Sequence, residues 1–122
     1  MINRAVWFDI PAVDLERAAE FYKAVLNVQA EKQEADAVTF YVLQRDGGNS
    51  GCLVPAEEEI RSDGGILLYL NVDGRIRDAV IKVEENGGKV IQRIHSIPPH
   101  GYRAVVLDSE GNRIALHSTV DA

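Results

Sequence analysis

The sequence predicts an α+β protein built from two tandem βαβββ units. Each half of the chain carries one amphipathic helix pattern, flanked by short stretches that alternate apolar and polar residues as strands do. The order of these patterns repeats at an offset of about 60 residues, which fits two copies of one unit better than a solenoid of many shorter repeats. Two such units side by side give a curved eight-stranded mixed sheet around a cleft, with the helices outside.

The chain has 122 residues, which corresponds to a single domain. We predict that this domain spans 1–122, with unit 1 at about 1–56 and unit 2 at about 65–120. The acidic stretch "AEEEIRSDGG" between them has the composition of an exposed connection. The two halves correspond most closely in "VDLERA" with "VDGRIRDA", and in "DGGNSGCLV" with "DSEGNRIALHS".

The first unit opens with a strand pattern in "AVWFDI", which Pro11 is expected to end. A helix follows in "DLERAAEFYKAVLN", with Asp14 as its predicted N-cap and Asn27 as its stop. Its apolar residues recur on one stripe: Leu15, Ala18, Ala19, Tyr22, Val25 and Leu26. Further strands are predicted in "VQAEKQ", "AVTFYVLQ" and "SGCLVP", with the turn "RDGGNS" before the last.

The second unit repeats this order. "GILLYLNV" is a predicted strand, and "DGRIRDAVIKVEENGG" is a predicted helix that Gly87 and Gly88 end. The apolar face of this helix holds Ile76, Ala79, Val80 and Val83. Three more strands are predicted in "KVIQRIH", "GYRAVVLD" and "NRIALHS".

Composition excludes several classes of function. The net charge is −6 and no run of lysines or arginines is present, which argues against a nucleic-acid-binding protein. No apolar run approaches the roughly 20 residues of a membrane span. The N-terminal "MINRAVWFDI" has no signal-peptide core, which predicts a cytoplasmic location. Cys52 is the only cysteine, so it forms no internal disulfide, and we expect it to be a small buried residue.

Three stretches together resemble a known family. They are "WFDIPAVDLERAAEFYKAVLN", "GGILLYLNVD" followed by "GGKV", and "GYRAVVLDSEGNRIALHS". Their order and spacing are similar to those of the vicinal oxygen chelate superfamily, which includes glyoxalase I, bleomycin-resistance proteins and extradiol dioxygenases. The resemblance covers nearly the whole chain. It is closest to poorly characterised proteins described only as related to lactoylglutathione lyase.

The resemblance implies where a metal would bind. Metal-dependent members hold a divalent ion in the cleft with ligands from the first and last strand of each unit. Those positions are Trp7, Cys52, Leu67 and Ala115 here. Three of the four have no donor atom for such an ion, and one thiol does not make a site. A one-residue shift restores no ligand set, because the neighbours are Phe8, Leu53, Leu68 and Ile114. We therefore predict no metal in the usual site and no other cofactor.

Residues two apart on a strand share a face. This rule adds Asp9 beside Trp7, Tyr69 and Asn71 beside Leu67, and His117 beside Ala115. The next strand adds Tyr102 or Arg103, and the loop "HSIPPHG" adds His100 at the rim. The predicted ligand-binding set is therefore Trp7, Asp9, Cys52, Leu67, Tyr69, Asn71, His100, Tyr102, Ala115 and His117.

Several of these residues also have a structural interpretation. Asp9 is either a carboxylate paired with Arg103 or Arg113, or a general base whose pKa burial raises. His117 and His100 are either structural histidines or cleft residues. Trp7 either fills the space of the metal or stacks on a planar ligand. The remaining motif residues are predicted to be structural: Phe21 and Tyr22 in the core, Gly111 and Asn112 in a turn.

Two functions remain open. The first is a metal-independent protein that binds a small molecule, planar or aromatic, as bleomycin-resistance proteins bind their drug. The second is a lyase- or isomerase-type enzyme that uses Asp9, Tyr69 or His117 as acid–base groups. The sequence shows no pairing of a nucleophile with a base, which favours binding. We also expect a homodimer, because units of this family commonly pair across chains and open sheet edges need covering. The cleft then forms within one chain or between two.

Overall fold

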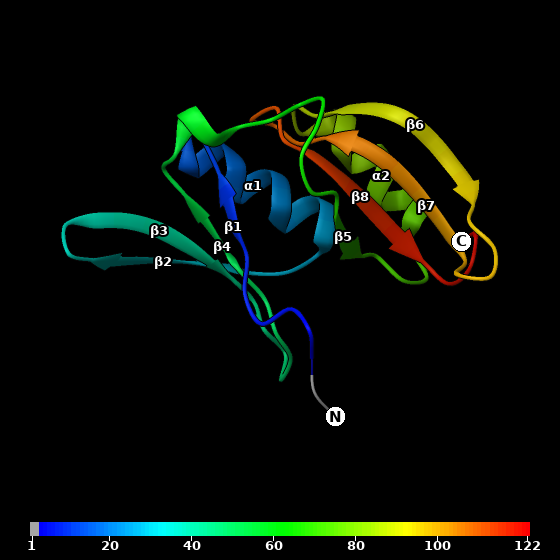
Figure 1. Ribbon diagram of the computed structural model, residues 1–122, viewed down its shortest axis with the longest axis horizontal. Coiled ribbons are helices and arrows are strands. Elements are labelled where there is room, and N and C mark those ends of the chain that lie inside the picture. Colours follow the sequence, from blue (N-terminus) through cyan, green and yellow to red (C-terminus); the bar gives the residue numbers. More distant parts are fainter. Residues whose placement is uncertain (1–2) are drawn as a thin grey trace.

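The computed structural model describes residues 3–122, so the first two residues of the predicted unit 1 lie outside the described part. The chain follows the order βαβββ twice, which confirms the predicted α+β tandem fold (Figure 1). Unit 1 contains β1 (Asp9–Pro11), α1 (Leu15–Leu26), β2 (Ala30–Ala35), β3 (Val38–Leu43) and β4 (Cys52–Val54). After a 3-10 turn at Glu57–Glu59, unit 2 contains β5 (Leu68–Asn71), α2 (Ile76–Glu85), β6 (Lys89–Ser96), β7 (Tyr102–Leu107) and β8 (Arg113–Ser118).

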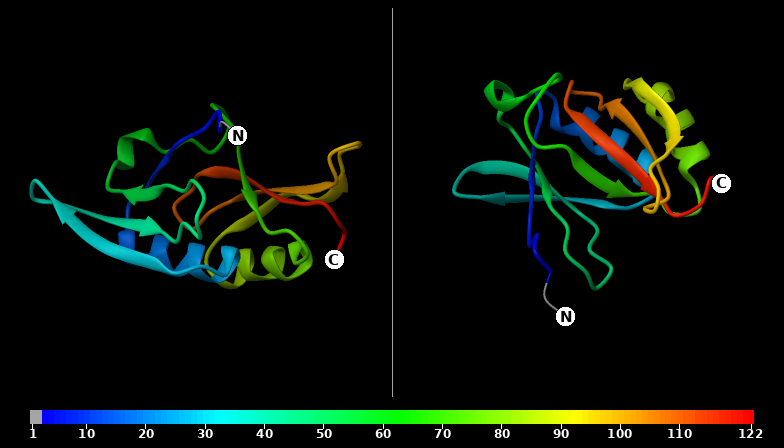
Figure 2. Two further views of the ribbon diagram at one scale, coloured as in Figure 1. Left: turned by 90° about the horizontal axis from the view of Figure 1, so that it is seen from below. Right: turned by 45° about the vertical axis from the view of Figure 1, so that its right-hand side comes forward.

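The eight strands of the described residues form two four-stranded mixed sheets with equivalent strand orders, β1-β4-β3-β2 and β5-β8-β7-β6. In each sheet the first strand pairs in parallel with the last, and the remaining pairs are antiparallel. Within residues 3–122 no ladder joins β1 to β5, so the strands are divided between two open sheets. The helices α1 and α2 contact each other and lie on one side of the strands (Figure 2).

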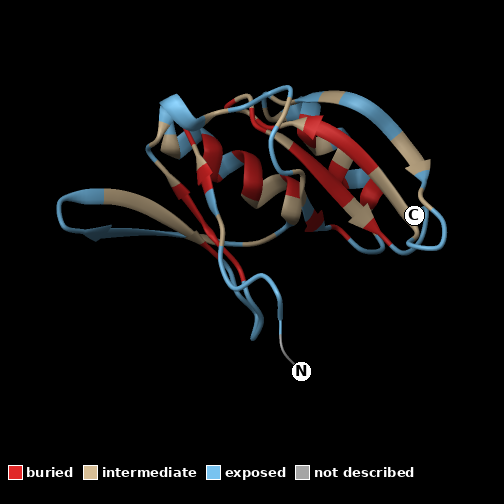
Figure 3. Cartoon of the chain, in the orientation of Figure 1, coloured by how far each residue is buried: buried red, intermediate tan, exposed pale blue. Residues whose placement is uncertain are grey.

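The hydrophobic core lies where the two helices meet the sheets (Figure 3). The predicted apolar stripes face it, and the residues of α1 and α2 that are fully buried are Ala18, Ala19, Phe21, Tyr22, Val25, Ile76, Ala79 and Val83. Phe21 and Tyr22 are core residues as predicted, and their rings meet edge-on at 4.9 Å between centroids. The hairpin of β2 and β3 extends away from this core and buries little (Figures 1 and 3).

The predicted signals at the helix ends are confirmed. The side chain of Asp14 accepts a hydrogen bond from the Arg17 backbone N–H, and Asn27 ends α1 in the left-handed conformation with φ 56°. After α2, Gly87 adopts φ 90° and the Gly88 N–H donates to the Val83 carbonyl at 2.8 Å. Residue 88 also has to be glycine, because a Cβ there would lie 2.5 Å from the Leu107 carbonyl oxygen.

The first strand is shorter than predicted. It begins at Asp9 instead of at residue 5, and it includes Pro11 as its last residue. The reason is its partner: β1 pairs only with the three-residue strand β4, so the residues before Asp9 have no ladder position to occupy. Trp7 therefore precedes the strand. Neither helix in the described part of the chain is long and apolar enough to cross a membrane.

Candidate functional site

A row of polar side chains crosses the second sheet on the face opposite its core. Asn71 is in register with His117, His117 with Arg103, and Arg103 with His95. Residues directly opposite each other in a ladder share a face, so these four side chains form one line across β5, β8, β7 and β6. Tyr69 stands two residues before Asn71 and shares this face. We call these five residues the polar row.

Arg103 is the centre of the polar row. Its Nε donates to Nε2 of His95 at 3.0 Å, and its Nη1 donates to the hydroxyl of Tyr69. The guanidinium carbon lies 5.8 Å from the centre of the Tyr69 ring, within range of a cation–π interaction. No carboxylate lies within ion-pair distance of Arg103 in residues 3–122. Two uncharged groups thus hold the cation.

The hydrogen bonds also assign the histidine tautomers. Nε2 of His95 accepts from Arg103, so the proton is on Nδ1, which lies 2.8 Å from the Arg93 carbonyl oxygen. Nε2 of His117 lies 2.6 Å from the His100 carbonyl oxygen and therefore carries a proton. The His117 ring meets the Tyr69 ring edge-on, with 6.4 Å between centroids. This leaves Nδ1 of His117 without a partner among the described residues.

The polar row is accessible. Tyr69 is 44% exposed, Asn71 is exposed, and His117 is half-buried. Ala115 lies opposite Tyr69 in the ladder between β5 and β8 and is fully buried. Ala115 thus lies on the face of the polar row, but its methyl has no exposed surface.

The first sheet carries a second, separate group. Asp9 and Cys52 are in register, and the Cys52 thiol donates to Oδ1 of Asp9 at 3.2 Å. Burial raises the pKa of the Cys52 thiol, and the bond to Asp9 adds to the shift. Cys52 is buried, as predicted. Asp9 makes no ion pair with Arg103 or Arg113 in residues 3–122, so the predicted pairing is not found.

A pocket of about 200 Å³ lies between the end of β1, the connection of the two units and the starts of β5 and β8. Asp9, Arg61 and Arg113 line it, but the polar row does not. Tyr69 and His117 instead line a shallow hollow at the end of β5. The structure therefore separates Asp9 from the other two predicted acid–base residues.

The structure brings together Tyr69, Asn71, Ala115 and His117 of the predicted set. Of the two alternatives for β7, Tyr102 packs against the core, whereas the neighbouring Arg103 belongs to the polar row. His100 contributes its carbonyl oxygen, and its side chain is exposed. Trp7 lies two residues before β1 and is 42% exposed, and Leu67 lies directly before β5 and is half-buried.

His95 was not among the site residues predicted from the sequence. Its only signal in the sequence is the place of a histidine near the end of an alternating strand. Placing His95 in the polar row requires the register between β6 and β7. This register shifts at a bulge or irregularity before His95, so it does not follow from the sequence alternation alone.

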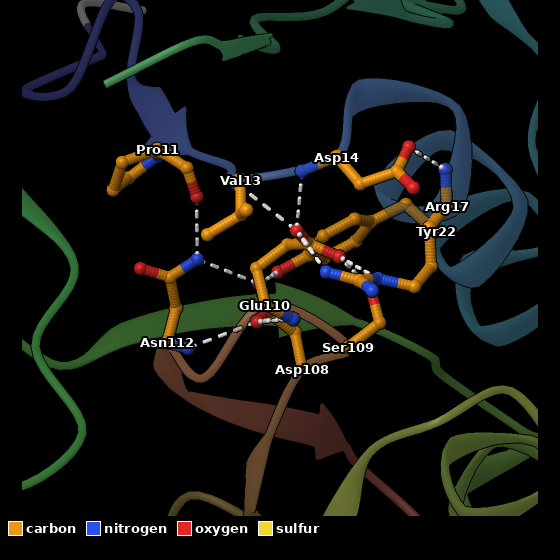
Figure 4. Close-up of polar contacts among 9 residues, drawn as sticks. All are labelled: Pro11, Val13, Asp14, Arg17, Tyr22, Asp108, Ser109, Glu110 and Asn112. Atoms are coloured by element: carbon orange, nitrogen blue, oxygen red, sulfur yellow. Dashed lines mark hydrogen bonds and ion pairs between the residues drawn. The ribbon is translucent and has the colours of Figure 1, made fainter. Parts of the chain in front are cut away.

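The turn before β8 carries a buried polar network that joins the two units (Figure 4). The Tyr22 hydroxyl donates to Oδ2 of Asp108 at 2.5 Å, and Asn112 Nδ2 donates to the same oxygen at 2.9 Å. The other oxygen of Asp108 accepts from the backbone N–H groups of Glu110 and Asn112. Burial raises the pKa of Asp108, although these hydrogen bonds act in the opposite direction. Burial also raises the pKa of Tyr22 well above its usual value.

Glu110 completes this network at the start of α1 (Figure 4). Its carboxylate accepts from the backbone N–H groups of Val13 and Asp14, and it pairs with Arg17 at 2.7 Å. Burial alone would raise the pKa of Glu110, but the bonds from Arg17, Asp14 and Ser109 outweigh it and lower the pKa to about 2. Both carboxylate oxygens of Asp108 and of Glu110 accept hydrogen bonds from protein groups, which indicates a structural role.

Gly111 and Asn112 are turn residues, as predicted, and Asn112 also forms a hydrogen bond between the two units. Gly111 adopts φ 99°, the left-handed conformation that glycine favours. Asn112 is a turn residue, and its side-chain amide also donates to the Pro11 carbonyl at 2.7 Å. This bond links the start of β8 to the end of β1.

The chain belongs to the Glyoxalase/Bleomycin resistance protein/Dioxygenase superfamily, which it matches over residues 4–116. A glyoxylase-like domain-containing protein from Didymella fabae is 29% identical, and the alignment covers 88% of each chain. A family enzyme from Burkholderia phytofirmans PsJN has a similar structure, with a TM-score of 0.73, 21% identity and coverage of 93% of this chain and 96% of that one. The fosfomycin resistance protein FosX from Listeria monocytogenes gives a TM-score of 0.70, 12% identity and coverage of 97% and 94%.

The donors at the family's metal positions do not fit a metal ion. Of Trp7, Cys52, Leu67 and Ala115, only Cys52 has a ligating atom, and its thiol donates a hydrogen bond to Asp9. Among the residues that the structure describes, no three His, Cys, Asp or Glu side chains are grouped to hold a metal ion. The metal content of the protein remains a prediction for elemental analysis.

Proposed function

We propose that this protein binds a small molecule in the superfamily's cleft without a metal at the usual site. One observation carries the proposal: three of the four metal positions have no donor atom, while the second sheet presents the hydrogen-bonding groups of the polar row on β5, β6, β7 and β8. A site of this composition can hold and orient a ligand, but it supplies no Lewis acid from the usual position.

Two exposed aromatic residues support this proposal. Trp7 is 42% and Tyr69 44% exposed, and neither belongs to the core. Such rings offer apolar area for stacking together with a hydrogen-bonding group. Similar proteins are named for antibiotic resistance, against fosfomycin in the Listeria protein and against bleomycin in the superfamily. A planar or antibiotic-like molecule is therefore the class of ligand that we propose.

A lyase- or isomerase-type enzyme is the second candidate, and the contact of Tyr69 with His117 favours it. Nδ1 of His117 could accept a proton from a ligand, and the Tyr69 hydroxyl could donate one. Asp9 lies on the other sheet and is not part of this pair. This candidate requires that the protein converts a bound ligand to a product. His117→Gln should abolish this conversion and leave binding of the ligand intact.

Metal analysis and fluorescence together test the proposal. We expect purified protein to contain no stoichiometric Zn, Ni, Fe or Mn. A panel of small planar molecules should include some that saturably quench or shift the emission of Trp7, the only tryptophan. One metal ion per chain, removed by chelator with loss of the ligand response, would contradict metal independence. A panel without any saturable response would contradict ligand binding at Trp7.

A further inference from the structure

We infer that the ligand carries a carboxylate or a similar small anionic group, and that Arg103 binds it. This inference rests on the proposed binding function and names the chemical class of its ligand. It follows from three properties of the polar row: an unpaired cation, a fixed orientation of that cation, and a second donor beside it.

The charge of Arg103 is the first property. Arg17, Arg75 and Arg77 each pair with a carboxylate of the chain. Arg103 is half-buried and has no such partner in residues 3–122, although the chain has a net charge of −6. A guanidinium has five N–H donors, and Arg103 uses two of them for hydrogen bonds to the side chains of His95 and Tyr69. The remaining donors suit a planar anion with two oxygens.

The orientation of the guanidinium is the second property. His95 holds Nε and Tyr69 holds Nη1, so the group is fixed from two neighbouring positions before a ligand arrives. Fixing a donor in advance lowers the entropy that binding would cost. His95 is held in turn by the Arg93 carbonyl. His95 is thus a positioning residue for Arg103.

Tyr69 supplies the third property. Its hydroxyl oxygen accepts from Arg103, so its own proton is free to donate to a ligand. The exposed ring of Tyr69 gives apolar area next to these donors. Asp73, the carboxylate that lines the same hollow as Tyr69 and His117, already accepts hydrogen bonds from the backbone N–H and the hydroxyl of Thr119. An aromatic carboxylate matches this combination of cation, hydroxyl donor and ring.

Calorimetric titration with matched pairs of acids and amides tests the inference. The probes are benzoate and benzamide, 2-naphthoate and 2-naphthamide, and indole-3-acetate and indole-3-acetamide. We expect at least one acid to bind roughly 10-fold to 100-fold more tightly than its amide, the range that hydrogen bonds to a charged group give. Arg103→Gln should remove this preference, and Arg103→Lys should restore part of it.

The control variant is Arg45→Gln. It removes the same charge from an exposed turn, where the Arg45 side chain bonds only weakly to the Gly48 carbonyl at 3.5 Å. We expect it to leave acid binding unchanged. His95→Ala should weaken the acid and spare the amide, and His95→Gln, which keeps an acceptor for Arg103, should recover most of the loss. Melting temperatures close to that of the parent protein show that each variant is folded.

The outcomes separate the two proposals. Amides that bind as tightly as their acids, or acids that bind Arg103→Gln as tightly as the parent, would overturn the anionic ligand but retain the binding function. If Arg45→Gln loses as much acid binding as Arg103→Gln, the role of Arg103 would also be overturned, because the loss would then reflect only the net charge of the protein. If no acid and no amide binds, both the inference and the proposed function fail.

Discussion

Glu110 is a charged side chain with no solvent exposure, located where the two units meet. Its environment lowers its pKa from 4.5 to about 2. A carboxyl group with a lower pKa in the folded state than in the unfolded state stabilises the fold when it is ionised. The contribution of Glu110 is therefore complete above about pH 4.5 and is lost as the pH falls through about 2.

This pKa shift gives the first prediction. Glu110→Gln should lower the free energy of unfolding by about 2 kcal/mol near neutral pH, less than the full shift implies because solvent screens the half-exposed Arg17. The difference between parent and variant should shrink as the pH falls from about 4.5 toward 2. Urea denaturation across this pH range measures it. A difference that stays constant with pH would show that ionisation of Glu110 does not stabilise the fold.

Trp7 gives the second prediction. A fully buried tryptophan would cost roughly 3–5 kcal/mol on truncation to alanine. Trp7 is 42% exposed and lies outside the core, so we expect Trp7→Ala to cost clearly less and to weaken planar ligands. Thermal denaturation and ligand titration measure the two effects. A strongly lowered melting temperature, together with a parent protein that shows no ligand response, would place Trp7 in a structural role.

At the scale of elements, α1 is held along its length by side chains of the second unit. Glu110 accepts from the N–H groups at its start, and Nη1 of Arg75 donates to the Val25 carbonyl at its end, at 2.7 Å. A negative charge at the start of a helix and a positive charge at its end both complement the helix dipole. Tyr22 adds the bond to Asp108 between these two ends.

Removal of that central bond is the third prediction. Tyr22→Phe leaves Asp108 with one hydrogen bond fewer in a buried position, so it should lower the free energy of unfolding by about 1–3 kcal/mol. Tyr41→Phe is the matched control, because the Tyr41 hydroxyl donates at 2.7 Å to the exposed Glu16. Chemical denaturation should show a much smaller effect for the control. Equal effects of the two substitutions would show that the buried hydrogen bond to Asp108 stabilises the fold no more than the exposed bond to Glu16.

Local sequence patterns predicted the helices and their ends because caps and stripes depend on neighbours in the chain. The faces of β7 were harder to predict. Four consecutive apolar residues, 104–107, follow Tyr102 and Arg103, so the alternation does not show which of the two faces the core. The first residue of β1 is set by the length of its partner strand β4. The hydrogen-bond partners of Glu110 are set by the contact between the two units. Neither is a local property of the sequence.

At the scale of the whole molecule, both sheets are open and the hairpin of β2 and β3 buries little of its surface. Val38 in this hairpin and Ile91 in the edge strand β6 are each 46% exposed. Unpaired edges and exposed apolar residues favour association with another chain. The fold alone thus leaves surface that a second copy would cover.

The fourth prediction is therefore a homodimer. Light scattering at micromolar concentration should give twice the 13.4 kDa mass of one chain. Val38→Lys, which places a charge on the exposed side of the hairpin, should shift the equilibrium toward the single chain without lowering helix content. A parent protein that scatters as a single chain at these concentrations would contradict the prediction.

The attachment of α1 to the second unit also limits how the molecule can move. Sliding of one unit along the other would break the bonds of Glu110, Tyr22 and Arg75 together, so a shear motion between the units is unfavourable. Because the polar row is already accessible, a ligand would bind to it without a rearrangement of the two units, so the free and the bound protein should have nearly the same backbone.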